Sequence, residues 1–341
     1  MLMPLMALRR RDFLTLMGTG AVSTVALAAC GKLGGSKVKG PTIGMLQMVD
    51  APPPNAVRKG FEAALAQAGY NPGQSVNYIQ KDAAGELPNT TLVMKKFVSD
   101  QVDMVFAIGT PPLQAAMKTV PETTPVIFAY CSNPWGAGAG TPPGGVGQHK
   151  PNVVGTIGTN PMGKELDLAR TINPQLKTVG VIFNPGEPNS EYEAKVLREE
   201  AAKRGITVIE QSVANSGEVL QAAQVLAEKN IEAFVKIGDY ATIQGFGSIA
   251  KVGLEKKIPV YSVDADDIKL PGCLATIGWA YYDDGYAAGE IAVKVLKGES
   301  PKTMAFEPLT KTESNVNLVT AKAIGVTVPE AVIADAKEVI R

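Results

Sequence analysis

The chain has 341 residues, of which 45% are hydrophobic and 19% charged, so it is long enough for two globular domains with separate cores. Its 33 basic and 33 acidic residues balance, which disfavours nucleic-acid binding because that requires an excess of positive charge. Beyond the N-terminus, no stretch is apolar for long enough to span a bilayer.

Residues 1–30 have the pattern of an export signal. Three arginines at 9–11 precede a mildly apolar run at 13–29, and LAACG occupies residues 27–31. RRDFL resembles a twin-arginine signal, with Sec export as the alternative, and LAACG resembles a lipobox, which implies that Cys30 carries a lipid. A buried N-terminal helix is the other interpretation. We expect an extracytoplasmic protein, lipid-anchored to a bacterial membrane in the periplasm or at the cell surface, with residues 31–40 as a flexible tether.

Residues 41–157 alternate between short apolar runs and helical patterns, which is typical of a parallel α/β sheet. The expected strands are 42–47, 75–80, 104–108, 126–130 and 153–157, and the expected helices are 57–68, 90–99 and 113–119.

Residues 178–205 form the clearest strand, turn and helix unit of the chain. A β-branched run at 179–183 is broken by Asn184 and the following prolines, and a helix begins near Asn189 or Ser190 with Glu191 and Glu193 in its first turn. The turn therefore presents free backbone N–H groups at the carboxyl end of a strand, where open α/β sheets bind ligands.

The same unit occurs earlier, at residues 41–70. Gly44 corresponds to Gly180 and Gly69 to Gly205, and the offset between the copies is the same for both pairs. Two later segments also repeat, at nearly the same offset. Four matched elements in the same order predict an α/β fold of two similar lobes, each a doubly wound parallel sheet.

The second lobe is expected to contain a helix at 162–171 and strands beginning near residues 179, 207, 233, 260 and 274. A helix at 284–297 is expected to return to the first lobe. The predicted first lobe is thus 41–157 plus 279–302, and the second is 158–278. Residues 303–341 are assigned to neither.

Histidine and cysteine, which many catalytic and metal sites require, are scarce, so a Ser-His-Asp triad is possible only through one loop histidine. The single histidine, His149, lies in a Gly/Pro-rich loop, and CxxC, HExxH and GxSxG are absent. Cys131 and Cys273 are expected to be buried thiols, with a disulfide as the alternative. GAGAG at 136–140 lacks the following helix of a dinucleotide-binding turn. We therefore expect no cofactor, no metal and no enzyme activity.

If the two lobes face each other through the carboxyl ends of their strands, the loops between them contain many acids but no Lys or Arg. This favours a small zwitterionic ligand, such as an amino acid, over an anion. Asp239 and Asp264 are the candidates for its ammonium group. Helix N-termini with Thr110, Ser132 and Ser190 are the candidates for its carboxylate. The other predicted binding residues are Gln47, Asn133, Asn189 and Tyr281, with an apolar wall from Met48, Trp135, Tyr240 and Trp279.

Several motifs together, GTPPLQ, PVIFAYCSNPWGAG, NPGEPNS and IPVYSVDAD, resemble the substrate-binding proteins of ABC transporters, in the family that includes binders of tryptophan and other aromatic amino acids. The resemblance implies a type I periplasmic-binding-protein fold, a ligand trapped between the lobes, and transporter permease subunits as partners. A sugar or polyol binder on the same fold, a Rossmann-like enzyme and a ligand sensor are the alternatives.

Overall fold

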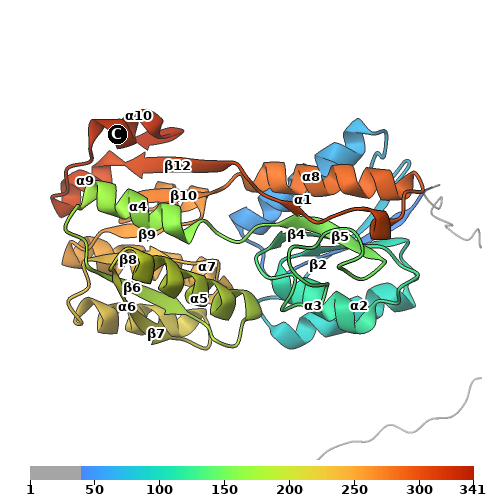
Figure 1. The fold of residues 1–341 in the computed structure, drawn as a ribbon, viewed down its shortest axis with the longest axis horizontal. Coiled ribbons are helices and arrows are strands. Elements are labelled where there is room, and N and C mark those ends of the chain that lie inside the picture. Colours follow the sequence, from blue (N-terminus) through green and yellow to red (C-terminus); the bar gives the residue numbers. More distant parts are fainter. Residues whose placement is uncertain (1–39) are drawn as a thin grey trace, which may run out of the picture. The chain divides into compact units, whose positions relative to one another are not determined.

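The computed structural model describes residues 40–341, so the expected export signal, Cys30 and nearly all of the tether lie outside the described residues. The described part is built on two separate sheets, each covered by helices (Figure 1). The predicted fold class, two α/β lobes with parallel sheets, is confirmed.

The first lobe contains a six-stranded sheet in the order β11-β5-β4-β3-β1-β2, and all of its pairs are parallel. Helices α1 and α8 pack against each other on one face, and α2 and α3 lie together on the other (Figure 1). The elements are β1 (Thr42–Gln47), α1 (Pro52–Gln67), β2 (Asn77–Asp82), α2 (Leu87–Ser99), β3 (Met104–Ile108), α3 (Thr110–Thr119), β4 (Val126–Cys131), β5 (Val153–Ile157), α8 (Tyr281–Leu296) and β11 (Glu307–Pro308).

The second lobe contains a seven-stranded sheet in the order β13-β12-β10-β9-β8-β6-β7, in which only the pairing of β12 with β10 is antiparallel. Its elements are α4 (Met162–Ile172), β6 (Thr178–Phe183), α5 (Pro188–Lys203), β7 (Thr207–Ser212), α6 (Val219–Ala227), β8 (Ala233–Lys236), α7 (Tyr240–Lys256), β9 (Val260–Ser262), β10 (Ala275–Trp279), β12 (Thr312–Asn317), α9 (Leu318–Ile324), α10 (Glu330–Asp335) and β13 (Glu338–Ile340). Three short 3-10 helices complete the described chain: η1 (Ser216–Glu218), η2 (Ala265–Lys269) and η3 (Pro301–Thr303).

The chain passes between the sheets three times: after β5, after β10 and between β11 and β12. Helix α8 packs mainly on α1, so the chain returns to the first lobe after β10. The C-terminal segment is divided, because β11 pairs with β5 in the first sheet while β12 and β13 extend the second.

The two copies of the internal repeat pair their first two strands in the same register. Gly44 is opposite Ile79 in β2, and Gly180 is opposite Ile209 in β7. Both glycines are the third residue of their strand, and a Cβ on either would come within 2.8 Å of a side chain packed over the sheet. Both lobes therefore need a residue without a side chain at the same place.

Three helices of the first lobe begin earlier than the sequence pattern predicted, at Pro52, Leu87 and Thr110. Each has a proline in its first two positions. Proline fits there because the first-turn N–H groups have no partner within the helix and its fixed φ already suits a helix. The Pro-rich segments that looked like turns are therefore the first turns of helices.

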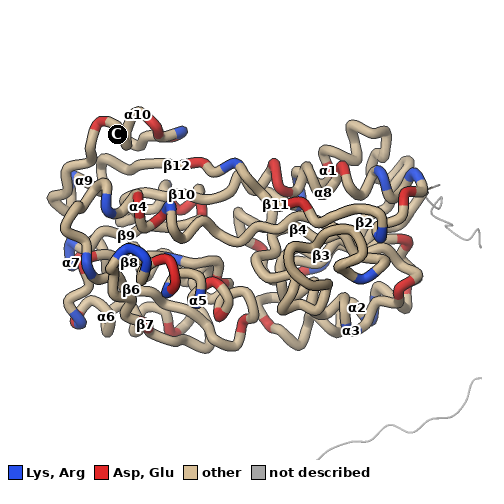
Figure 2. Tube along the Cα trace, viewed as in Figure 1, with Lys and Arg blue, Asp and Glu red and all other residues tan. Residues whose placement is uncertain are grey.

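Charged residues are distributed over both lobes (Figure 2). Within residues 40–341, no broad region of positive charge stands out along the chain trace, in keeping with the equal numbers of acids and bases. This distribution gives no support to a nucleic-acid partner.

Candidate functional site

A narrow cavity lies where the carboxyl ends of strands from both sheets meet. Its volume is about 20 Å³, which is room for about one water molecule, so a larger solute must move its walls apart. It is lined by Tyr130, Ser132, Gly158, Asn160, Asn189, Glu193, Gly238, Tyr240 and Ile243.

Glu193, one turn into α5, places a buried carboxylate at this cavity. It is 1% exposed and accepts hydrogen bonds from Asn160 Nδ2, 3.1 Å from each carboxylate oxygen, and from the backbone N–H of Gly238 at 2.6 Å. Among residues 40–341, no Lys or Arg lies within ion-pair distance of it. Burial raises the pKa of Glu193 to about 7, against the lowering effect of these hydrogen bonds.

Two amide oxygens at the same cavity have no hydrogen-bond partner: Asn160 Oδ1 and Asn189 Oδ1. Their orientations are defined, because Asn160 Nδ2 donates to Glu193 and Asn189 Nδ2 donates to the Gly238 carbonyl at 2.7 Å. A buried acceptor without a donor is costly. With Glu193 they form a group of three acceptors that suits a ligand ammonium, which has three N–H donors.

Aromatic rings form the other wall. Tyr130, at the end of β4, lies edge-to-face with Tyr240 and Tyr281, with ring centroids 6.4 Å and 5.0 Å apart. Ser132, two residues further on, has a buried hydroxyl without a partner. The first lobe therefore contributes an aromatic surface and a free hydroxyl.

Asp239 and Asp264, the acids predicted to hold the ligand's cation, have partners within the protein. Asp239 accepts from the N–H of Thr242 at 2.6 Å and of Asn184 at 2.7 Å, so it caps α7. Asp264 pairs with Lys236 and accepts from the Tyr281 hydroxyl at 2.7 Å. Neither lines the narrow cavity.

Lys236 is a buried cation that the sequence did not predict for the site, because it lies within β8 and not in a loop. Its Nζ pairs with Asp264 and, at 2.7 Å, with Asp267. Burial acts to lower the pKa of Lys236, but the two carboxylates outweigh burial and raise it well above its ordinary value. Glu193 was also not predicted as a ligand-binding residue, because it lies within a helix and not in a loop. Its i, i+4 spacing from Asn189 puts both residues on one face of α5.

Only some of the other residues predicted for the site line the narrow cavity. Ser132 and Asn189 line it. Ser190 is fully buried with an unpartnered hydroxyl, but it does not line the cavity. The Thr110 hydroxyl lies 3.4 Å from Cys131 Sγ, and Asn133 accepts from the N–H of Gly136 in a turn.

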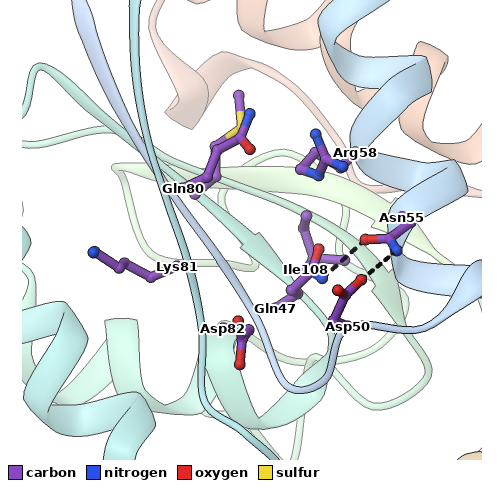
Figure 3. Close-up of a pocket in the computed structure, with 9 residues that line it drawn as sticks. Gln47, Asp50, Asn55, Arg58, Gln80, Lys81, Asp82 and Ile108 are labelled. Carbon is purple, nitrogen blue, oxygen red and sulfur yellow. Dashed lines mark hydrogen bonds between the residues drawn. The ribbon is translucent and has the colours of Figure 1, made fainter.

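Gln47 lies at a second cavity within the first lobe, between β1, β2 and α1 (Figure 3). Its Nε2 donates to Asn55 Oδ1 at 3.0 Å, and Asn55 in turn donates to Asp50. This cavity of about 240 Å³ shares no lining residue with the narrow one. The structure therefore does not bring Gln47 together with Glu193.

The residues predicted to form the apolar wall also separate. Tyr240 lines the cavity and Tyr281 packs behind Tyr130, whereas Trp135 stacks on Phe306 and Met48 is in the core. The Trp279 indole donates to the Thr159 carbonyl at 3.0 Å, in the first crossover.

Cys131 and Cys273 are free and buried, as predicted, so the alternative disulfide is not formed. In the described part of the chain, no three metal-binding side chains gather. No described helix combines the length and apolar character needed to cross a membrane.

Two parallel-sheet lobes, joined by crossovers and meeting at a cavity with a buried, unpaired carboxylate, define the chain as a two-lobed solute-binding protein. The chain belongs to the ABC transporter substrate binding protein family, whose family model matches residues 42–340.

The relatives agree with this assignment. A tyrosine-binding protein from Clostridioides difficile is 32% identical over 93% of both chains. The structure of an ABC domain from Streptococcus pneumonia in complex with L-Trp is 27% identical and has a TM-score of 0.82, with 89% of this chain and all of that one covered. A conserved domain protein from Vibrio cholerae is 26% identical with a TM-score of 0.83, over 88% of this chain and all of that one.

Proposed function

We propose that this ABC transporter substrate-binding protein binds an amino acid with an aromatic side chain in the narrow cavity. The observation that carries the proposal is the buried Glu193 carboxylate, which has no counter-cation among the described residues and lies beside two unpartnered amide oxygens. A ligand ammonium would supply both the missing charge and the missing donors.

The ligand carboxylate would lie at the start of α5. The N–H groups of Asn189 and Ser190 are in the first turn of that helix, where they have no intrahelical acceptor. Prolines in the first turns of α1 and α3 remove N–H donors from the first lobe, and Pro188 removes one from α5 as well. Ser132, with its free hydroxyl, is a further donor from the first lobe.

The ligand side chain would pack on Tyr130 and Tyr240, because flat aromatic groups favour edge-to-face and offset contacts with other rings. Two relatives, a tyrosine-binding protein and a protein whose structure is a complex with L-Trp, support an aromatic amino acid.

The chain would act outside the cytoplasm as a ligand carrier rather than an enzyme. Ligand binding would draw the two lobes together about the crossovers, and the permease subunits of the transporter would recognise that form. Cys30, in LAACG, would carry the lipid that keeps the protein at the membrane.

Calorimetry on the purified protein tests the ligand class. L-tryptophan, L-tyrosine and L-phenylalanine are expected to bind, and indole-3-propionate, which lacks the ammonium group, is expected to bind at least tenfold more weakly than L-tryptophan. Tryptamine, which lacks the carboxylate, measures how much the carboxylate contributes to affinity, separately from the ammonium group. Binding of glucose or ribose with no response to amino acids would overturn the proposal in favour of a sugar binder.

A further inference from the structure

Tyr130 adopts a backbone conformation that its neighbours must stabilise. Its φ is +55°, in the left-handed region, which costs a non-glycine residue about 1 kcal/mol or more. The pairing of β4 with β5 also shifts register between Phe128 and Cys131. The equivalent residue of the second lobe, Asp264 at the end of β9, has an ordinary φ of −100°. The repeated fold does not itself require the strained conformation.

Asp284, in the first turn of α8, holds this backbone. The N–H of Tyr130 donates to Asp284 Oδ2 at 2.9 Å, and the Thr156 hydroxyl donates to Asp284 Oδ1. Asp284 is 1% exposed, and no described Lys or Arg pairs with it. Burial raises its pKa to about 6, while the bonds from Thr156 and Tyr130 lower it. These two hydrogen bonds are the partners that the structure gives the buried Asp284 carboxylate.

We propose that Asp284 is a positioning residue for ligand recognition: it fixes the Tyr130 backbone so that the Tyr130 ring stands in the narrow cavity. This inference rests on the proposed function, because it assigns the Tyr130 ring to the ligand. Asp284 acts through Tyr130 and is not among the residues that line the cavity.

The position of Asp284 in the chain supports this role. Helix α8 directly follows the second crossover, and its first residue, Tyr281, donates to Asp264 in the second lobe. Tyr281 and Asp284 are three residues apart, on one face of α8. One helical turn therefore contacts the equivalent strand ends of both lobes, and the Tyr281 ring also packs against Tyr130.

A double-mutant cycle tests the proposal. Asp284→Ala and Tyr130→Ala are made singly and together, and the affinity for L-tryptophan is measured by calorimetry. Each single change is expected to weaken binding about tenfold. The double variant is expected to bind within about twofold of Tyr130→Ala, because without the ring there is nothing left to position. Losses that add up, or an Asp284→Ala variant that binds like the parent, would overturn the inference.

Three further variants separate positioning from folding. Asp284→Asn keeps an acceptor for the Tyr130 N–H and is expected to restore affinity to within a few-fold of the parent. The exposed neighbour substitution Asp283→Ala is expected to leave affinity unchanged. If Asp284→Ala does not fold, Thr156→Val, which removes one of the two bonds, replaces it in the same cycle. Full affinity of Tyr130→Ala alone would instead contradict the proposed ligand site.

Discussion

The two lobes share the order of their central strands, yet equivalent positions near the carboxyl ends of those strands differ in charge. Where the first lobe has Ala107, Thr110 and Tyr130, the second has Lys236, Asp239 and Asp264. The first lobe thus presents neutral side chains, and the second presents ions. The two lobes therefore differ in chemistry at these equivalent positions, because the first has uncharged side chains while the second has ions that are paired or hydrogen-bonded within the protein.

The N–H groups at the starts of the helices also differ between the two lobes. Prolines remove N–H donors from the first turns of α1 and α3. In the second lobe, Glu187 accepts from the N–H groups of Tyr240 and Ala241, and Asp239 accepts from that of Thr242, so the start of α7 is fully used. In α5, Pro188 likewise donates no N–H, but the first-turn N–H groups of Asn189 and Ser190 have no intrahelical acceptor, which would suit the carboxylate of the proposed ligand.

The largest expected effect is on the buried ion pairs of Lys236 in the second lobe, since the described ion pairs of the first lobe are more exposed. Lys236→Met leaves Asp264 and Asp267 buried without a cation, so the free energy of unfolding is expected to fall by about 3–5 kcal/mol in urea titrations. Lys195→Met, at an exposed pair on α5, is the control and is expected to change it by less than about 0.5 kcal/mol. A loss below about 1 kcal/mol for Lys236→Met would show that the pair contributes little to the second lobe.

The next effect is on affinity. Glu193→Gln keeps the size of the side chain but removes its charge, and losing a charge-assisted bond worth about 1.5–3 kcal/mol weakens binding roughly 10- to 150-fold. Calorimetry with L-tryptophan measures the change. Glu191→Gln, in the first turn of the same helix but with an exposed side chain, is the matched control. A change of less than twofold for Glu193→Gln would place the ligand's ammonium elsewhere.

Affinity is expected to depend on pH in a defined direction. The ammonium requires ionised Glu193, whose pKa is raised to about 7 in the unliganded protein, so the fraction able to bind falls as the pH drops below 7. Between pH 8 and pH 6 the dissociation constant is expected to rise about tenfold, with proton release on binding at the lower pH. The Glu193→Gln variant is expected to lose this dependence, and a slope that persists in it would assign the titration to another group.

The smallest expected effect is on stability, at the residue before α7 and at its counterpart in the first lobe. Asp239→Ala removes the cap of α7 and is expected to lower the free energy of unfolding by about 1 kcal/mol. Thr110→Ala, at the equivalent position of the first lobe, is expected to cost less, because the Thr110 side chain caps no helix. A tenfold loss of affinity in Asp239→Ala with unchanged stability would mean that Asp239 binds the ligand directly.

Patterns close together in sequence predicted the fold well. Strands 42–47, 104–108 and 153–157 were predicted with the bounds observed, because buried parallel strands are short β-branched runs between breakers. The strands of the C-terminal segment were not assigned. β11 and β12 are polar, and they pair with β5 and β10, which lie earlier in the chain. The local sequence of β11 and β12 therefore does not indicate these pairings.

The site was only partly predictable, for a different reason. Acids in loops were predicted to bind the ligand because ligands bind at strand ends. In the structure, however, Asp239 caps a helix and Asp264 pairs with a buried lysine. Glu193 lies a full turn inside a helix, where its charge looks like an ordinary solvated face. The carboxylate reaches the cavity beside Gly238, where a Cβ would lie 2.8 Å from Glu193 Oε2, and this long-range contact is not visible in the local sequence.

The division of the C-terminal segment has a consequence for how the chain folds. Until residues 307–317 leave the ribosome, β5 and β10 remain open edges that could pair with other chains. The first lobe also lacks α8 until synthesis has passed Leu296. Residues up to 317 must therefore be made before β5 and β10 are both covered by their later partner strands.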